Sequence, residues 1–299
     1  MRVIAIVGPT AAGKSALSIA LAHALNGEVI NCDSMQFYRG MDIGTAKLTP
    51  AEREGVPHHL LDIWPVTQAA SVAVVQKLAR AAIGDVRARG RTPLLVGGTG
   101  LYLRAVLEDF AFPGTDHEVR DRLEADLARL GPGPLHERLA AADPAAAARI
   151  LPSNGRRIVR ALEVIELTGG PFVAELPQPQ PLYANLQLAV DRADLDARVE
   201  QRIENMWKAG LVDEVRSLIP QGLRDGRTAS RALGYQQVLE YLDGRCTEEE
   251  AYAATVAGTR KFVRRQRKWF RRDPAVVWLD GAADDLKEQA LAHIQGAGS

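Results

Sequence analysis

Residues 8–15, Gly-Pro-Thr-Ala-Ala-Gly-Lys-Ser, match the phosphate-binding loop pattern G-x-x-x-x-G-K-[ST] in full. The apolar run Met1–Val7 before them suits a buried parallel strand, and Ala16–Leu25 after them indicates a helix. In this arrangement backbone N–H groups surround a phosphate at the helix N-terminus, the Lys14 charge meets the terminal phosphates, and the Ser15 hydroxyl ligates Mg²⁺. A glycine-rich turn without a ligand would leave the apolar-flanked Lys14 unexplained.

This loop also sets the predicted fold. A phosphate loop between a buried strand and a helix is typical of an α/β core in which helices flank a parallel sheet. The loop alone does not decide which phosphate compound binds. We expect the phosphate site to consist of Gly8, Pro9, Thr10, Ala11, Ala12, Gly13, Lys14 and Ser15.

The position of the nearest carboxylate is unusual for such a loop. Phosphate-loop kinases and hydrolases end a second apolar strand in an acidic residue that holds Mg²⁺. Here the candidate strand Thr92–Val96 is followed by Gly97-Gly98-Thr99-Gly100, and the carboxylate Asp33 instead follows the strand Glu28–Cys32. Because ligands bind at the carboxyl edge of an open α/β sheet, we expect Asp33 to face the phosphate loop as a base. The alternative is that Asp33 and the next serine cap a helix.

Motifs along nearly the whole chain, in a fixed order, carry a more specific signal. They are residues 8–15, 33–38 (Asp-Ser-Met-Gln-Phe-Tyr), 42–47 (Asp-Ile-Gly-Thr-Ala-Lys), 57–62, 96–102, Arg198 with 200–202 and Met206, Gly234-Tyr235, and 259–271. In this set the chain resembles the tRNA dimethylallyltransferases. These enzymes transfer a prenyl group from dimethylallyl diphosphate to the exocyclic N6 amine of an adenosine on the 3′ side of the anticodon.

The resemblance implies a division of roles. The loop, Arg202 and Mg²⁺ at Ser15 would hold the diphosphate, while Asp33, Thr99 and Lys14 would form the catalytic set. The partners would be dimethylallyl diphosphate and the anticodon stem-loop of tRNA. The residues expected to contact tRNA are Asp33, Ser34, Met35, Gln36, Thr99, Arg120, Arg156, Arg157, Arg160, Arg231, Gly234, Tyr235 and Gln236.

A helical insertion interrupts the strand–helix alternation. The alternation runs to about Phe112, and from His117 apolar residues recur at helical spacing. We expect one helix from His117 that ends at 131–134, a second over 135–142, and a third from a cap at 153 or 154 to Gly169. Residues 177–181 read as a stiff linker. The predicted domains are a discontinuous core, 1–112 and 188–299, and a tRNA-binding insertion, 113–187.

Two basic segments fit an anionic partner. In the third insertion helix Arg157 and Arg160 share a side, although a solvated face is the commonest role of helix arginines. Residues 259–272 are rich in lysine and arginine, with an apolar stripe that includes Phe262 and Trp269. The stripe predicts a core helix, and so dense a positive face predicts that diphosphate or the tRNA backbone meets it.

The composition limits the remaining choices. The formal net charge is zero, so a nucleic acid must be met by local basic patches. Cys32 and Cys246 have no metal or redox spacing, and we expect Cys32 to be a small buried residue. His58 and His59 suggest packing roles, and Asp62 is a weaker carboxylate candidate. No signal peptide or membrane-length apolar run is present, which predicts a cytosolic protein, and we expect a monomer.

Three other functions remain open at this point. A kinase of a nucleoside or other small metabolite would consume ATP and needs the Mg²⁺-binding acid that is missing after residues 92–96. A prenyltransferase of free AMP or ATP would not need the insertion or the basic helix. A pure RNA-binding module would leave the phosphate loop without a role.

Overall fold

The chain folds into two compact units in this computed structural model, which describes residues 1–109, 112–172 and 180–296. The core unit comprises Met1–Glu108 and Pro181–Ser299, and the helical unit is Asp109–Gln180. The chain leaves and re-enters the core unit at one place, where the Leu182 N–H donates to the Leu107 carbonyl at 2.8 Å. The division falls earlier than the expected boundaries at 112/113 and 187/188, since residues 185–187 already pair with the first strand.

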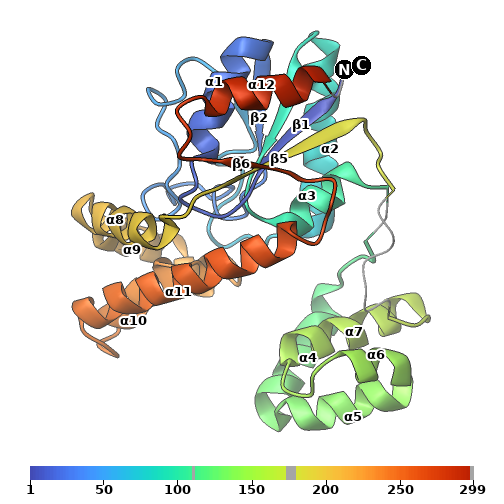
Figure 1. Ribbon diagram of the computed structural model, residues 1–299. Helices are drawn as coiled ribbons and strands as arrows, with labels where there is room; N and C mark the ends of the chain where they lie inside the picture. The colour runs from blue at the N-terminus through green and yellow to red at the C-terminus, as the bar shows by residue number, and fades with distance from the viewer. Residues whose placement is uncertain (110–111, 173–179, 297–299) are drawn as a thin grey trace. The chain divides into compact units, whose positions relative to one another are not determined.

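A six-stranded parallel sheet forms the centre of the core unit (Figure 1). Its strand order is β3-β2-β4-β1-β5-β6, so the strand before the phosphate loop lies inside the sheet. The side chains of β1 alternate: Ile4 and Ile6 face one apolar cluster, and Val3, Ala5 and Val7 the other. The strands are β1 Val3–Val7, β2 Gly27–Asn31, β3 His58–His59, β4 Thr92–Val96, β5 Asn185–Asp191 and β6 Val277–Asp280.

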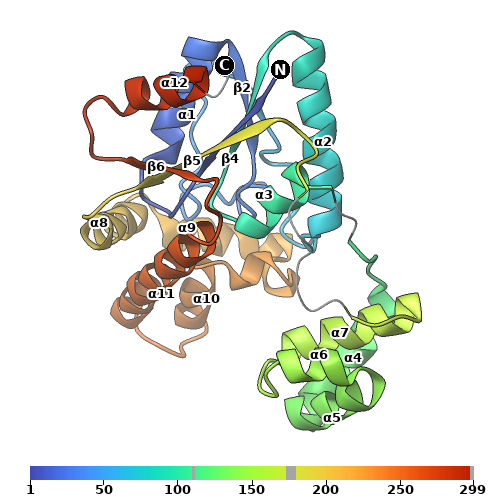
Figure 2. The same ribbon diagram turned by 45° about the vertical axis from the view of Figure 1, so that its right-hand side comes forward.

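Helices cover both faces of the sheet, as expected for a parallel sheet (Figure 2). Two helices pack on the face of the sheet that carries Ile4 and Ile6, and two others pack on the opposite face. In the described part of the chain, none of the helices combines the length and the apolar character needed to cross a membrane. The four helices are α1 Lys14–Leu25 and α12 Leu286–Gly296 on one face, and α2 Val72–Ala88 and α3 Gly100–Leu107 on the other.

A second layer of helices gathers at the carboxyl edge of the sheet (Figure 1). It has its own apolar cluster, to which Leu211, Val215 and Tyr235 contribute together with Tyr38 from the loop after β2. The helices are α8 Leu195–Lys208, α9 Leu211–Leu218, α10 Tyr235–Leu242 and α11 Glu248–Phe270, and the 3-10 turns are η1 Ile219–Gln221, η2 Leu223–Asp225 and η3 Ala229–Arg231.

The basic helix α11 begins eleven residues before the segment that the sequence analysis singled out at Thr259. Thr247 caps it: the Glu250 N–H donates to the Thr247 hydroxyl, and the Thr247 N–H donates to the Glu250 carboxylate. This capping box, with three glutamates in the first turn, starts the helix where the pattern of basic residues gives no hint of it.

The helical unit packs four helices around its own small core, to which Leu123, Leu139, Ile158 and Leu162 contribute. The second helix begins at Pro132 rather than at residue 135, because proline is well tolerated at a first helical position. The expected linker at 177–181 lies mostly outside the described residues. The four helices are α4 His117–Leu130, α5 Pro132–Ala142, α6 Pro144–Arg149 and α7 Gly155–Thr168.

Candidate active site

The phosphate loop turns from β1 into α1 through two glycines with positive φ. Gly8 has a φ of +117°, and a Cβ there would lie 2.4 Å from the Val190 carbonyl oxygen of β5. Gly13 has a φ of +109° and precedes the first residue of α1. Both positions therefore require glycine, one for packing and conformation and the other for conformation alone. The result is an open helix N-terminus that points backbone N–H groups into the loop.

Three cationic side chains converge on this loop. The Lys14 ammonium group curls back and donates to the Pro9 carbonyl at 2.6 Å. From α8, Arg202 donates to the Thr10 hydroxyl at 2.8 Å and Arg198 to the Ala11 carbonyl at 2.9 Å. Arg202 was predicted to bind at the loop, whereas Arg198 stands in a family motif and had no predicted role. The structure shows that consecutive turns of α8 carry both.

The electrostatics of the loop favour an incoming anion. Burial and, to a smaller extent, the neighbouring Arg202 charge together lower the pKa of Lys14 to about 8, although the Asp33 carboxylate opposes the shift. Burial is also the main cause that lowers the pKa of Arg202. Positive charges that repel each other and have lost water are stabilised by a bound polyanion. The loop is therefore arranged for a phosphate compound.

Asp33 stands at the carboxyl end of β2 and is held by its neighbours. Its N–H donates to the Asn31 side-chain oxygen at 2.9 Å, and the Asn31 amide donates to the carbonyls of Asp33 and Leu60, both at 3.1 Å. One carboxylate oxygen, Oδ1, accepts from the Met35 N–H at 3.0 Å and so caps a turn, not a helix. Because β2 pairs with β4 and β4 pairs with β1, all in parallel, Asp33 follows β2 at the same edge of the sheet as the phosphate loop. Its charge opposes the lowering of the pKa of both Lys14 and Arg202.

Thr99 lies on the turn between β4 and α3, which the sheet places beside the phosphate loop because β4 pairs with β1. Two glycines bring this turn close to its neighbours. A Cβ at Gly97 would lie 2.6 Å from the Cys32 carbonyl carbon, and one at Gly98 would lie 2.1 Å from the Gln266 side-chain nitrogen. Thr99 begins α3 without capping it through its side chain, so the hydroxyl is not used to hold the helix.

Gln266 of α11 was not among the predicted site residues, yet it contacts two parts of the site. The side chain is buried, with 5% of the residue exposed. Its oxygen accepts from the Thr10 N–H at 3.0 Å, and its nitrogen donates to the Gly98 carbonyl at 3.1 Å. A signal was present in the sequence: an amide lies on the buried stripe of a basic helix, between Val263 and Phe270.

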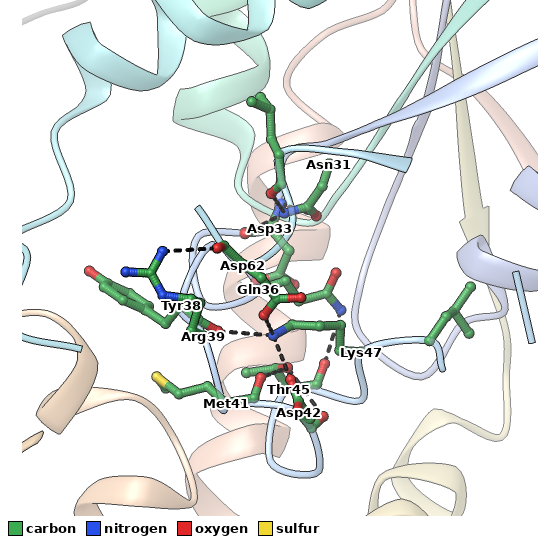
Figure 3. A network of polar contacts seen from close by, with 12 residues as sticks. Asn31, Asp33, Gln36, Tyr38, Arg39, Met41, Asp42, Thr45, Lys47 and Asp62 are labelled. Atoms are coloured by element: carbon green, nitrogen blue, oxygen red, sulfur yellow. Dashed lines mark hydrogen bonds and ion pairs between the residues drawn. The ribbon is translucent and has the colours of Figure 1, made fainter. Parts of the chain in front are cut away.

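The loop after Asp33 is held by a buried lysine (Figure 3). The Lys47 ammonium group donates to the Tyr38 carbonyl at 2.9 Å and to the carboxylates of Asp42 and Asp62, both at 2.6 Å. Asp62, the weaker carboxylate candidate, thus serves as a partner of Lys47. In the same loop the Gln36 amide donates to the Thr45 carbonyl at 3.1 Å, which fixes one of the predicted tRNA-contacting side chains.

The segment of Arg231, Gly234, Tyr235 and Gln236 divides into a buried and an exposed part. Tyr235 is 0% exposed, and its hydroxyl donates to Glu214 at 2.5 Å. Gly234 has a φ of +88°, and a Cβ there would meet its neighbours only at ordinary contact distances, so the backbone conformation requires the glycine. The side chains of Arg231 and Gln236 are exposed. Of this set, these two present side chains at the surface of the core unit.

The arginines of the helical unit also divide. Arg120 and Arg160 both pair with Glu163, which is 0% exposed, at 2.8 Å each. Arg160 donates further to the carbonyls of residues 113 and 114, so it ties the entry segment to α7. Arg156 and Arg157 are exposed on the first turn of α7. The predicted cluster of four thus combines two exposed arginines with two that hold a buried carboxylate.

The basic helix α11 has the two faces that its sequence pattern predicted. Val263 and Phe270 are buried, and the Arg265 guanidinium lies 5.5 Å from the centre of the Phe262 ring. Ion pairs within the core unit engage Arg260, with Glu200, and Arg267, with Asp191. The exposed cationic side chains of this segment are Lys261, Arg264, Arg265, Lys268, Arg271 and Arg272.

The other singled-out residues have structural partners. Cys32 is buried, and burial raises the pKa of its thiol, as expected of an inert residue. His59 contacts the buried Glu28 at 2.6 Å, and His58 contacts the Val56 carbonyl at 2.8 Å. Within residues 1–109, 112–172 and 180–296, no cluster of three or more His, Cys, Asp or Glu forms a protein-only metal site.

Comparison with known proteins decides the family. The profile of the IPP transferases matches residues 36–273 of this chain. The chain belongs to the IPP transferase family. A tRNA dimethylallyltransferase of Salinispora arenicola is 68% identical over 297 residues, which cover 99% of this chain and 87% of that protein. One from Streptomyces avermitilis is 66% identical over 289 residues, covering 96% of this chain and 93% of its own length.

Solved structures agree with this assignment. A tRNA isopentenylpyrophosphate transferase from Bacillus halodurans is 42% identical, with a TM-score of 0.74 and coverage of 99% of this chain and 96% of its own. A eukaryotic dimethylallyltransferase acting on tRNA is 27% identical, with a TM-score of 0.82 and coverage of 99% and 78% respectively. The family and the α/β core that the motifs predicted are thereby confirmed.

Proposed function

We propose that this chain transfers the dimethylallyl group of dimethylallyl diphosphate to the exocyclic N6 amine of the adenosine on the 3′ side of the anticodon in tRNA, and releases diphosphate. The observation that carries the proposal is the pairing of a phosphate loop, over which Lys14 and Arg202 lie, with a carboxylate on the side of that loop. That carboxylate is Asp33, just after β2, whereas glycines and no carboxylate follow the strand β4.

The loop is the donor site. Its backbone N–H groups, Lys14 and Arg202 bind the diphosphate, and the same groups stabilise the charge that grows on it as the bond to the allylic carbon breaks. Thr10, which accepts from Arg202, keeps that guanidinium over the loop. Groups that hold the leaving diphosphate lower the barrier as well as the donor dissociation constant, since the charge on the leaving group increases towards the transition state.

A Mg²⁺ ion fits this donor site through Ser15. Mg²⁺ in phosphate sites takes one or two protein ligands and completes its shell with water and substrate oxygens, so it needs no cluster of carboxylates. The Ser15 side chain lies in the first turn of α1, next to Lys14 and beside the loop that would hold the diphosphate. When bound, the ion supplies positive charge against the diphosphate oxygens.

Asp33 serves the acceptor. The target adenine must leave its stack to reach the carboxyl edge of the sheet. Its amine nitrogen attacks the allylic carbon, the carbon–oxygen bond to diphosphate breaks, and the amine proton passes to the Asp33 carboxylate. The backbone and Asn31 contacts of Asp33 fix the carboxylate for this task. We assign the Thr99 hydroxyl to a hydrogen bond with the substrate, since it does not cap α3.

The tRNA is met by local surfaces, because the net charge of the chain is zero. On the core unit these are Ser34, Met35, Gln36, the exposed residues Arg231 and Gln236, and the cationic face of α11. On the helical unit Arg156 and Arg157 contact the RNA, and Arg120 and Arg160 do so from their pairs with Glu163. The buried Tyr235, with Gly234, acts indirectly by holding Glu214. The protein works as a monomer in the cytoplasm.

One assay tests this function against its rivals. Dimethylallyl diphosphate labelled in the prenyl group is incubated with the protein and Mg²⁺, and tRNA, AMP and ATP are offered separately as acceptors. We expect label on tRNA alone. Label on AMP or ATP at a comparable rate would contradict a tRNA enzyme, and consumption of ATP without prenyl transfer would indicate a kinase.

A further inference from the structure

The Gln266 carboxamide joins two segments that leave neighbouring strands. The phosphate loop follows β1 and the turn of Gly98 follows β4, and these strands pair in parallel with Ile6 opposite Val96. The two segments therefore emerge side by side at the carboxyl edge. Between them, the Gln266 oxygen accepts from the Thr10 N–H at 3.0 Å, and its nitrogen donates to the Gly98 carbonyl at 3.1 Å.

An amide side chain suits the space between the Thr10 N–H and the Gly98 carbonyl. One segment offers a backbone donor and the other a backbone acceptor, and each loses free energy if it is buried without a partner. Glutamine supplies both complementary groups on one planar unit, whereas a carboxylate or an aliphatic chain of similar length supplies at most one. The fit is tight, because a Cβ at Gly98 would lie 2.1 Å from the Gln266 nitrogen.

The helix that carries Gln266 is firmly seated. Val263 and Phe270 flank it on the buried stripe of α11 and pack into the two apolar clusters on opposite faces of the sheet. Gln266 accepts from the backbone N–H of Thr10, and the hydroxyl of the same Thr10 accepts from Arg202. Gln266 also donates to the carbonyl of Gly98, which is the residue before Thr99. A single side chain thus lies between the donor loop and the acceptor turn.

We infer that Gln266 is a positioning residue that sets the spacing between the phosphate loop and the Thr99 turn. Through this spacing, the diphosphate held by the loop and the adenine bonded at Thr99 meet in the geometry that the transfer requires. Gln266 touches neither reacting atom and acts through Thr10 and Gly98. The inference rests on the proposed function, because it assigns the two segments to the donor and the acceptor.

The test separates positioning from donor binding. Gln266→Met keeps the length of the side chain and removes both hydrogen bonds. We expect diphosphate affinity, measured by calorimetry, to stay within about threefold, because Lys14, Arg202 and the loop amides remain. We expect kcat for transfer to tRNA to fall by about ten- to a hundredfold, because sub-ångström misplacement of reactants is costly. Gln289→Met, at a glutamine on α12 far from the loop in sequence, is the matched control and should leave both quantities unchanged.

A second experiment uses the crowding at Gly98. Gly98→Ala is made alone and together with Gln266→Ala, and kcat is compared in a double-mutant cycle. If the alanine methyl displaces the glutamine, the penalty of Gly98→Ala is several-fold smaller when residue 266 is already alanine. Equal penalties in the two backgrounds would contradict the inference.

The outcomes distinguish this inference from the proposed function. A folded Gln266→Met with kcat within about twofold of the parent would overturn the positioning role alone. A loss of diphosphate affinity as large as the loss of kcat would also overturn it, because Gln266 would then belong to donor binding. Failure of the unmodified protein to prenylate tRNA would overturn the function, and the inference with it.

Discussion

Two pairs of cationic side chains in this protein have opposite relations to carboxylates. At the phosphate loop, Lys14 and Arg202 donate to neutral protein oxygens, a carbonyl and a hydroxyl. In the helical unit, Arg120 and Arg160 instead share the buried carboxylate of Glu163 at 2.8 Å each. The comparison teaches that cationic side chains mark a ligand site where their hydrogen bonds go to neutral oxygens, and a structural ion pair where they bind a buried carboxylate directly.

The difference has a physical origin in burial. Burial lowers the pKa values of both Lys14 and Arg202, which shows that their charged forms are destabilised until an anion arrives. Glu163 is fully buried, and a buried carboxylate without partners would cost several kcal/mol, about the penalty that its two arginines offset. Lys14 and Arg202 are therefore available to bind an anionic substrate, whereas Arg120 and Arg160 stabilise the helical unit through Glu163.

The largest effect is expected at the carboxylate beside the loop. Asp33→Asn keeps the shape and removes the base, so turnover should fall by about 10²–10⁴-fold. Diphosphate and tRNA affinities should stay within a few-fold, because the role of the carboxylate is proton transfer. Steady-state kinetics with calorimetry on the same preparation measures this. Near-normal turnover would remove Asp33 as the base.

The next effect concerns the loop pair itself. Lys14→Met should weaken diphosphate binding by about ten- to a hundredfold, the usual worth of a hydrogen bond to a charged group, and should slow the transfer as well. Calorimetry and single-turnover rates together measure this. If both affinity and rate held, the donor site would have to lie elsewhere, and the contrast between the two pairs of cations would lose its basis.

Deletion of the helical unit tests the other side of the comparison. Glu108 and Pro181 are bridged in the core unit, so residues 109–180 can be replaced by a short glycine linker. The remaining core should fold and bind diphosphate normally, and lose about tenfold or more in tRNA affinity. Its residual tRNA binding, carried by α11, should fall steeply with salt through counterion release. Binding curves at several salt concentrations check this, and full tRNA affinity would contradict a tRNA-binding insertion.

The lowered pKa of Lys14 predicts a pH dependence. Below about pH 8 the ligand-free protein carries a cationic Lys14, and above it the neutral amine dominates. Diphosphate affinity should therefore decline above about pH 8, by at most about tenfold for each pH unit, because binding then requires uptake of a proton. Calorimetry from about pH 6.5 to about pH 9.5 measures this decline. Lys14→Met, which cannot titrate, corrects for the ionisation of diphosphate, and an identical decline in that variant would refute the assignment.

The smallest effect is expected from loss of the ion pairs of Glu163 in the helical unit. Glu163→Gln removes the carboxylate that Arg120 and Arg160 share, and should lower the unfolding free energy of the helical unit by about 1–3 kcal/mol. Diphosphate binding by the core unit should be unaffected. Exposed Glu124→Gln on α4 is a surface comparison. Chemical denaturation followed by circular dichroism measures the change, and an unaltered stability would show that the buried pairing is not needed.

The parts of the structure that local sequence could predict are those whose causes are local. The loop pattern between a strand and a helix sufficed to place Lys14 and Ser15, and the rule for strand ends placed Asp33. The capping box of Thr247 and Glu250 is a local signal that locates the start of α11. Strand β3 has two residues, and the sequence gives no periodic signal for so short an element.

Other features depend on contacts between distant segments. Gln266 reaches Thr10 across 256 residues of sequence, and Glu214 accepts from the backbone N–H groups of residues 42–44. No local pattern pairs such groups. Tyr235 shows the converse, because its motif suggested an RNA contact, while packing against the second helical layer leaves it 0% exposed. Long-range packing therefore decides which polar groups face a ligand and which hold the fold.

The most direct test of the central claim is to locate the transferred group. tRNA is incubated with the unmodified protein, dimethylallyl diphosphate and Mg²⁺, then digested with nuclease and examined by mass spectrometry. We predict one added C5H8 unit, on the N6 nitrogen of the adenosine at the 3′ side of the anticodon, and none when Asp33→Asn replaces the protein over the same short time. A C5H8 unit at another nucleotide, or equal modification by Asp33→Asn, would contradict the account.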